Sequence, residues 1–247
     1  ALQDAQRRAW GLLDDSYIVP VATMVGAQHH GGLVLGAFLP DGRAVGLSFA
    51  FLGQTGGRRC LYSQLTGVIP GYQGKGLGAR MKDLQRDHAR SIGVSIIAWS
   101  FDPLQAGNAH FNLRRLGATA SRYIENMYGP RTDDLNRGVP TDRLIAEWPV
   151  ERVDLPVEDD FEALTSPRLV EGPNEPVVMS FASFEGTTPL LVEIPAEIAR
   201  LRVDDAPRAE RWRAAIAGAL TSSFAAGYVA EDVVREAGRS YYVLRRG

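Results

Sequence analysis

Residues 68–79 read Val-Ile-Pro-Gly-Tyr-Gln-Gly-Lys-Gly-Leu-Gly-Ala, and this stretch decides the fold. The segment before it, 59–69, predicts a strand, and the segment after it, 77–92, carries apolar residues at helical spacing. Glycines between a strand and a helix leave backbone N–H groups uncovered at the positive end of the helix dipole. The stretch therefore predicts a cradle for a phosphate group, to which Lys75 adds a positive charge.

The elements on either side of this glycine turn predict a mixed α/β sheet. Two short apolar runs joined through Pro40-Asp41-Gly42 predict a β-hairpin. Residues 94–101 are almost continuously apolar, which is typical of a central strand, and we expect it to run parallel to the strand before the helix. The remaining predicted elements are helices at 1–11 and 106–116 and strands at 33–39, 44–52, 120–128 and 143–148.

An acidic, proline-containing stretch at 151–160 predicts a linker, so we expect one domain at 1–149 and a second at 150–247. The second is predicted to contain strands near 177–184 and 190–194, a helix at 207–226 and strands at 228–234 and 241–245. Its order of helix, glycine, strand, turn and strand repeats that of residues 106–148. We interpret it as a partial copy of the first domain, which completes an acceptor site or forms a homodimer contact.

The composition excludes several classes of protein. No segment approaches the roughly 18 consecutive apolar residues of a membrane span. Residues 1–150 hold 16 Arg and Lys against 12 acidic residues, and residues 151–247 hold 11 against 17. The basic excess of the first part is unclustered, which argues against nucleic acid binding but suits a small polyanion.

The only two lysines, Lys75 and Lys82, both lie in or beside the glycine turn.

Cysteine and histidine content bears on location and metal binding. The single cysteine, Cys60, excludes an internal disulfide. The first residues lack the basic and then apolar order of a secretory signal, so we expect a cytoplasmic protein. The four histidines have no close cysteine partner. We therefore expect no metal site.

Two other kinds of phosphate-binding loop are alternatives for the glycine turn. A Walker loop requires Ser or Thr after its lysine, whereas Gly76 follows Lys75. The dinucleotide fingerprint fits Gly74-x-Gly76-x-x-Ala79, with Asp102 as a ribose-binding acid. That acid lies about 28 residues on instead of roughly 20, and an antiparallel meander precedes the glycines. An NAD-type protein stays as an alternative.

The order Val68-Ile69-Pro70 followed by Gln73-x-x-Gly76-x-Gly78 resembles the coenzyme A motif of the GNAT superfamily of N-acyltransferases, over residues 1 to about 149 and more loosely beyond. Segments 99–104, 108–113 and 141–144 resemble a branch of predicted acyltransferases linked to amino-acid N-acylation. The resemblance implies a GNAT-type mixed sheet flanked by helices, followed by a smaller α+β unit resembling a partial GNAT lobe. It also implies transfer of a short acyl group from acyl-CoA to a small primary amine such as an amino acid.

The same resemblance assigns a cofactor site. The glycine turn would hold the pyrophosphate, Val68 and Ile69 would pair with the pantetheine amides like an added strand, and two asparagines would contact the cofactor from the next helix. Helix capping and surface polarity are the alternative explanation of these asparagines. The site comprises Val68, Ile69, Gln73, Gly74, Lys75, Gly76, Leu77, Gly78, Ala79, Asn108 and Asn112.

The catalytic positions of the family are occupied by unusual residues. Tyr62 stands where many members have a glutamate base, and Leu113 where many have a tyrosine acid. We predict Asp102 as the base and Tyr123 as the acid, although Asp102 would equally shape a turn before Pro103 and Tyr123 would equally be a core aromatic. Further candidates are His29, His30 and Tyr62. Catalysis by positioning alone, or a non-catalytic acyl-CoA sensor, stays open.

Overall fold

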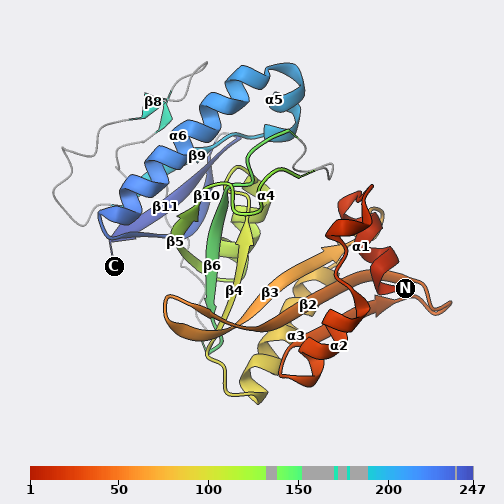
Figure 1. The fold of residues 1–247 in the computed structure, drawn as a ribbon. Helices are drawn as coiled ribbons and strands as arrows, with labels where there is room; N and C mark the ends of the chain where they lie inside the picture. Colours follow the sequence, from red (N-terminus) through yellow and green to blue (C-terminus); the bar gives the residue numbers. More distant parts are fainter. Residues whose placement is uncertain (132–137, 152–169, 172–176, 179–188, 237, 247) are drawn as a thin grey trace. The chain divides into compact units, whose positions relative to one another are not determined.

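A computed structural model describes residues 1–131, 138–151, 170–171, 177–178, 189–236 and 238–246. The chain forms two compact units (Figure 1). Unit 1 comprises Ala1–Trp99, Tyr128–Thr141 and Pro149–Glu151, and unit 2 comprises Ser100–Met127, Asp142–Trp148 and Arg152–Gly247. Each unit therefore combines segments from both sides of residue 127, and the domains 1–149 and 150–247 stay a prediction.

The sheet of unit 1 has the order β1-β2-β3-β4. The first three strands are antiparallel, and β4 runs parallel to β3. A parallel pair needs a crossover connection, and here α3 (Leu77–Ser91) supplies it. The predicted mixed α/β fold is confirmed. The strands are β1 (Leu33–Phe38), β2 (Ala44–Thr55), β3 (Arg58–Val68) and β4 (Ile96–Phe101), whose last two residues belong to unit 2.

Helices cover both faces of this sheet. Along β2, Leu47 packs in a core cluster with Ala5 of α1 (Leu2–Trp10), whereas its neighbour Ser48 accepts a hydrogen bond from Gln85 of α3. Because successive side chains of a strand point to opposite faces, α1 and α3 lie on opposite sides of the sheet. A Cβ at Gly67 would lie 2.3 Å from the Trp10 ring, so the approach of α1 to β3 requires glycine there.

Two helices were not predicted from the sequence. α2 (Val21–His29) begins after Pro20 and buries only Met24, so its sequence has no apolar stripe to reveal it. α5 (Ile198–Asp204) is seven residues long and buries only Ile198. A 3₁₀ turn, η1 (Asp15–Tyr17), connects α1 to α2, and the side chain of Asp14 caps it by accepting the N–H of Ser16.

The sheet of unit 2 is antiparallel, in the order β6-β5-β10-β11-β9. The predicted repetition matches the structure, because Gly117 and Gly227 each follow a helix and precede an antiparallel strand pair. The strands are β5 (Thr119–Ile124), β6 (Arg143–Pro149), β9 (Leu190–Ile194), β10 (Tyr228–Glu236) and β11 (Arg239–Arg246). The helices are α4 (Ala106–Ala109), which continues as the π-helix η2 (His110–Arg115), and α6 (Ala206–Ala225).

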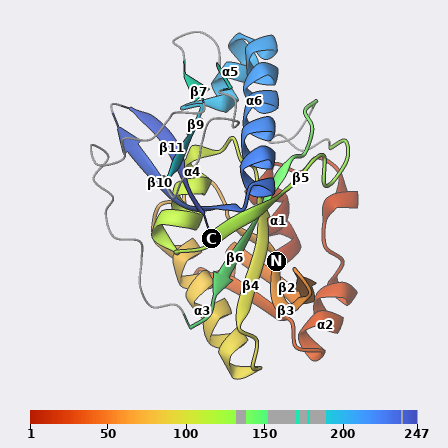
Figure 2. The ribbon, with the colours of Figure 1, turned by 90° about the vertical axis from the view of Figure 1, so that its left-hand side faces the viewer.

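Helix α6 covers this second sheet, lying along β5 and β10 (Figure 2). Asp205 caps it by accepting the N–H of Arg208, and a proline follows in its first turn. The short strands β7 (Val170–Glu171) and β8 (Val177–Val178) pair antiparallel. The rest of the predicted strand 177–184 and the predicted linker from residue 152 on lie outside the described residues. No helix in the described part of the chain is long and apolar enough to cross a bilayer.

Candidate active site

The glycine turn connects the end of β3 to the start of α3. Gly74 and Gly76 have φ angles of 73° and 80°, in the left-handed region that favours glycine. Gly76 is the N-cap of α3 and, because glycine has no side chain, no side-chain cap covers the first N–H groups of the helix. A Cβ placed at Gly74, Gly76 or Gly78 would meet no atom within 4 Å, so the space in front of the turn is open. This geometry suits an anion at the first backbone N–H groups of α3.

One side chain and one backbone group of the turn hold it against the strand. The Gln73 amide Nε2 donates to the carbonyl of Val68 at 2.9 Å, and the N–H of Tyr72 donates to the carbonyl of Ile69 at 3.2 Å. Lys75 is exposed, and its Nζ lies 4.9 Å from the centre of the Tyr72 ring. The predicted residues from Val68 to Ala79 are thus contiguous in space, and binding of coenzyme A by them stays a prediction.

β3 diverges from β4 beyond Tyr62. The two strands pair only at Leu61 with Ile97 and at Tyr62 with Ala98, and no further pair follows among the residues that the structure describes. β3 nevertheless continues beside β2 as far as Val68. Its edge on the β4 side therefore has no strand partner beyond Tyr62 in the described structure, apart from the Gln73 amide at the carbonyl of Val68, and suits an extended ligand chain that adds as a further strand.

A β-bulge marks the same point of β3. Phe49 of β2 pairs with Leu65 and the next residue, Ala50, pairs with Ser63, so that Gln64 is an extra residue without a partner in the ladder. Such a bulge bends its strand and redirects the side chains that follow. The bulge could not be predicted from the sequence, since neither glycine nor proline occurs there.

A pocket of about 370 Å3 lies on the α1 and α2 side of unit 1. One wall is the segment 16–20 together with Thr23 and Ala27 of α2, and the other is formed by Phe49, Phe51 and Gln64. The lining is mostly apolar and aromatic, with the polar Gln64 side chain supplied by the bulge. Sequence reasoning missed this pocket because α2 was not predicted.

On the opposite face, Lys82 of α3 is buried at the point where β3 and β4 diverge. Only 4% of the residue is exposed. Its Nζ lies 3.1 Å from Ser63 Oγ and 3.7 Å from the centre of the Trp99 ring. Burial lowers the pKa of the Lys82 ammonium to about 7. The sequence showed this lysine beside the glycine turn but not its burial.

Gln85, one turn further along α3, extends the same polar cluster. Its Nε2 donates to Ser48 Oγ at 2.6 Å and to Ser63 Oγ at 2.9 Å, and Ser48 is 3.0 Å from the hydroxyl of Thr66. Its Oε1 is buried and has no hydrogen-bond partner in the described structure. If the amide were turned over, its NH2 group would lie at this position and would find no acceptor. One atom of the side chain is therefore unsatisfied in either orientation.

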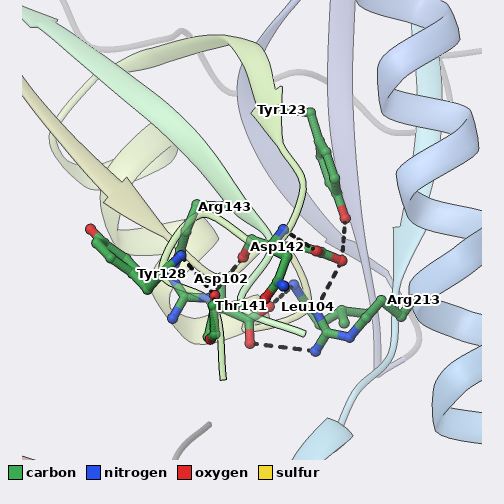
Figure 3. A network of polar contacts seen from close by, with 10 residues as sticks. Asp102, Leu104, Tyr123, Tyr128, Thr141, Asp142, Arg143 and Arg213 are labelled. Atoms are coloured by element: carbon green, nitrogen blue, oxygen red, sulfur yellow. Dashed lines mark hydrogen bonds and ion pairs between the residues drawn. The ribbon is translucent and has the colours of Figure 1, made fainter. Parts of the chain in front are cut away.

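Asp102, the predicted base, lies in a network of unit 2 (Figure 3). Its Oδ1 accepts the N–H of Leu104 at 2.9 Å, and its Oδ2 is 3.9 Å from Arg213 of α6. The carboxylate therefore shapes the turn after β4 and faces a guanidinium. Its role as base stays a prediction.

Tyr123, the predicted acid, belongs to the same network through Asp142. Its hydroxyl donates to Asp142 Oδ2 at 2.9 Å, and the Oδ1 of that carboxylate accepts the N–H of Asn126 at 2.9 Å. Arg213 approaches Asp142 at 3.4 Å. Burial, and then the negative charge of Asp142, raises the pKa of the Tyr123 phenol. The structure brings the two predicted residues into one network, in which Asp142 and Arg213 are the members that sequence reasoning missed.

The remaining predicted residues are scattered. Asn108 is exposed on α4, and Asn112 is buried in η2. Tyr62 is half-buried, with its ring centre 5.5 Å from that of Phe51. His29 and His30 are exposed at the end of α2.

Within the described ranges, no three His, Cys, Asp or Glu side chains lie close enough to hold a metal ion, and a metal-free mechanism stays a prediction.

Comparison with protein-family models and with curated proteins found no match. Among solved structures, nourseothricin acetyltransferase is 21% identical over 49% of this chain and 66% of its own length, just under two thirds, with a TM-score of 0.39. The putative acetyltransferase yncA of Salmonella typhimurium, solved with acetyl-CoA, is 18% identical over 64% of this chain and 90% of its own, with a TM-score of 0.45. The ribosomal-protein-S18-alanine N-acetyltransferase of Escherichia coli is 19% identical over 64% and 91%, with a TM-score of 0.44.

Proposed function

We propose that the protein is a GNAT-type N-acyltransferase that transfers an acetyl or other short acyl group from coenzyme A to a primary amine. The observation that carries the proposal is the glycine turn at the start of α3, which directly follows a strand that has left its parallel neighbour. An anion cradle and an open strand edge in succession fit a ligand with a pyrophosphate at one end and an amide-containing arm at the other.

The parts of the site divide the work of binding. The turn from Gln73 to Ala79 binds the pyrophosphate through backbone N–H groups, and the open edge of β3 from Ser63 to Val68 binds the pantetheine amides. Contacts of Asn108 and Asn112 with the cofactor stay a prediction from the family resemblance. The neutral amine then attacks the thioester carbonyl, and much of the rate comes from holding the two groups together.

The pocket beside α2 binds the acceptor amine. Its aromatic and aliphatic walls fit a small molecule with an apolar body, and Gln64 offers a hydrogen bond to a polar group. An amino acid or a similar small amine is the acceptor that we favour. A cytoplasmic location and a homodimer stay part of the proposal.

Replacement of Gly76 by alanine is expected to weaken acetyl-CoA binding at least tenfold. In the free protein the new Cβ meets no atom, so the cost is backbone strain of about 1–2 kcal/mol. In the complex, the methyl group would stand in the cradle. Calorimetric titration with acetyl-CoA measures the loss.

Gly42→Ala is the matched control for this variant. Gly42 lies in the β1–β2 turn with a φ of 84° and open space at its Cβ, so it carries the same strain away from the cradle. Equal acetyl-CoA affinity of the two variants would contradict the proposed pyrophosphate site. Thermal protection of the wild-type protein by NAD but not by coenzyme A would favour the dinucleotide alternative.

Replacement of Thr23 by tryptophan is expected to raise the KM for the acceptor about tenfold or more and to leave the affinity for acetyl-CoA unchanged. Thr23 is exposed on α2 and lines the pocket, so the indole fills the pocket without disturbing the core. Steady-state kinetics over an amino-acid panel measures the effect. Unchanged acceptor KM would place the acceptor elsewhere.

A non-catalytic acyl-CoA sensor is the second candidate. It is favoured by the engagement of Asp102 and Tyr123 with Arg213 and Asp142, which leaves neither in the role of a poised base or acid. Release of thiol from acetyl-CoA or succinyl-CoA in the presence of amines distinguishes the two. Binding without thiol release across a broad amine panel would support the sensor.

A further inference from the structure

Lys82 occupies a defined place relative to the strand divergence. The last residues that pair between β3 and β4 are Tyr62 and Ala98, and the Lys82 Nζ contacts the next residue of each strand, Ser63 and Trp99. The amine therefore lies at the closed end of the gap that the two strands open.

The surroundings of this amine are polar but uncharged. It contacts a hydroxyl from β3 and an indole from β4, and the nearest polar side chain of its own helix is Gln85, which bonds to Ser63 and to Ser48 of β2. No carboxylate, histidine or arginine within the described residues makes a hydrogen bond or ion pair with Nζ, and burial alone accounts for its low pKa.

An ammonium group without a counter-charge has capacity for an anionic ligand. Only one of the three N–H donors of Nζ makes a hydrogen bond in the described structure, to Ser63. The Oε1 of Gln85 is also buried and has no hydrogen-bond partner in the described structure, and as an acceptor it suits a group that carries a hydrogen, such as a thiol. A buried charge is costly unless it is paired, so a partner that carries negative charge would be stabilised here.

The reacting sulfur is the group expected at this place, if the proposed function holds. With the pyrophosphate at the glycine turn, the pantetheine arm runs along β3 from Val68 back towards Ser63, a span of about 16 Å at the rise of a strand. This span is comparable with an extended pantetheine arm. Its sulfur end then meets the closed end of the gap.

We propose that Lys82 is the general acid of the acyl transfer. It would take the role of the tyrosine that many family members have at the position of Leu113, whose side chain carries no proton to donate. The acceptor nitrogen forms a bond to the acyl carbon and loses a proton to water, and the C–S bond breaks with its electron pair moving to sulfur. The Lys82 ammonium donates a proton to that thiolate, which leaves as the thiol of coenzyme A. Water then returns a proton to the neutral amine.

A pKa near 7 suits this role. An ammonium with a pKa of about 7 is a stronger acid than an unperturbed thiol, about 8.5, and where its charge lowers the thiol pKa by about one to two units the proton transfer becomes nearly balanced. The same ammonium stabilises the thiolate before transfer, so the two groups titrate as a coupled pair.

The direct test is titration of the thiol of bound coenzyme A, followed by the ultraviolet absorbance of the thiolate. With the wild-type protein saturated by coenzyme A, we expect the apparent thiol pKa to fall by about one to two units relative to free coenzyme A. In Lys82→Met the shift is expected to disappear. Lys82→Gln, which keeps a hydrogen-bonding group for Ser63, is expected to lose the shift as well.

Lys75→Met is the matched control, because it removes the other lysine of the chain, which is exposed in the cradle. At saturation it is expected to keep the shifted thiol pKa. Turnover provides a second readout, with kcat for Lys82→Met about 100-fold lower and the Kd for acetyl-CoA changed by less than about threefold.

Three results would overturn the proposal. If the thiol of bound coenzyme A has the same pKa in the wild-type protein and in Lys82→Met, Lys82 is not the acid, and the proposed function is unaffected. Mass-spectrometric detection of an acyl group on Lys82 after incubation with acetyl-CoA makes the lysine an acceptor and not an acid. No binding of coenzyme A to the wild-type protein removes both the acid role and the proposed function.

Discussion

Replacement of Lys82 by methionine is expected to raise the free energy of unfolding at pH 7 by about 3 kcal/mol. Lys82 is buried away from any counter-charge in the described structure, and burial lowers its pKa from 10.5 to about 7. A shift of this size corresponds to roughly 4–5 kcal/mol of penalty on the ammonium form. Loss of the hydrogen bond to Ser63 offsets about 1 kcal/mol of the gain.

The sign of the pH dependence follows from proton uptake. Between pH 7 and pH 10.5 the unfolded chain holds a proton on Lys82 that the folded protein lacks, so stability rises with pH by about 1.4 kcal/mol per unit in that window. The penalty from Lys82 is therefore complete below pH 7 and absent above pH 10.5. The advantage of the methionine variant is expected to shrink across the same window.

Urea denaturation of the wild-type protein and Lys82→Met at pH 7 and pH 10 measures both effects. Lys75→Met serves as the control, because the removed ammonium is exposed and its loss should change stability by less than about 0.5 kcal/mol. A Lys82→Met protein that is less stable than the wild type at pH 7 would show that the ammonium has a partner which stabilises it.

Replacement of Arg213 by methionine is expected to lower the free energy of unfolding by about 3–5 kcal/mol. The side chains of Arg213 and Asp142 are only 10% and 8% exposed, and Asp102 is 15% exposed. Removal of the guanidinium leaves both carboxylates desolvated without its positive charge. Chemical denaturation at pH 7 measures the loss.

Asp142→Asn in the Arg213→Met background is the rescue variant. It removes one of the two uncompensated charges, keeps one oxygen to accept the N–H of Asn126, and lets the new amide nitrogen donate to the Tyr123 hydroxyl oxygen. We expect it to restore part of the lost stability, so that the two substitutions are non-additive. Additive losses would mean that Arg213 stabilises unit 2 through its hydrocarbon stem and not through its charge.

The glycine turn and the elements around it could be predicted because their signals are local. Gly74 and Gly76 occupy left-handed positions, and Gly93 follows α3 with a φ of 67°, as the position after a helix requires. Apolar continuity indicated that 94–101 is a central strand, and β4 is parallel to β3. These features depend on neighbouring residues in the chain, which the sequence displays directly.

The chemistry of the site could not be predicted, because it depends on register and side-chain direction. The extra residue Gln64 exists only relative to the pairing of β2, and the burial of Lys82 depends on Ser63 and Trp99, which come from two different strands. Arg213 and Asp142 are 71 residues apart in the chain. Contacts between residues so far apart leave no repeating pattern in the sequence. Asp102 and Tyr123 could therefore be proposed from the sequence, but the residues that they contact could not.

The pocket beside α2, if it holds the acceptor as proposed, has a consequence for how such a protein could change its substrate. One wall comes from a single continuous stretch, residues 16–27, whereas the other belongs to β2 and the bulge of β3. The cofactor turn and Lys82 lie in a later part of the chain. Under the proposed function, exchange of this one segment between related proteins would therefore change the preferred amine and leave acyl-CoA binding and protonation of the thiolate unchanged.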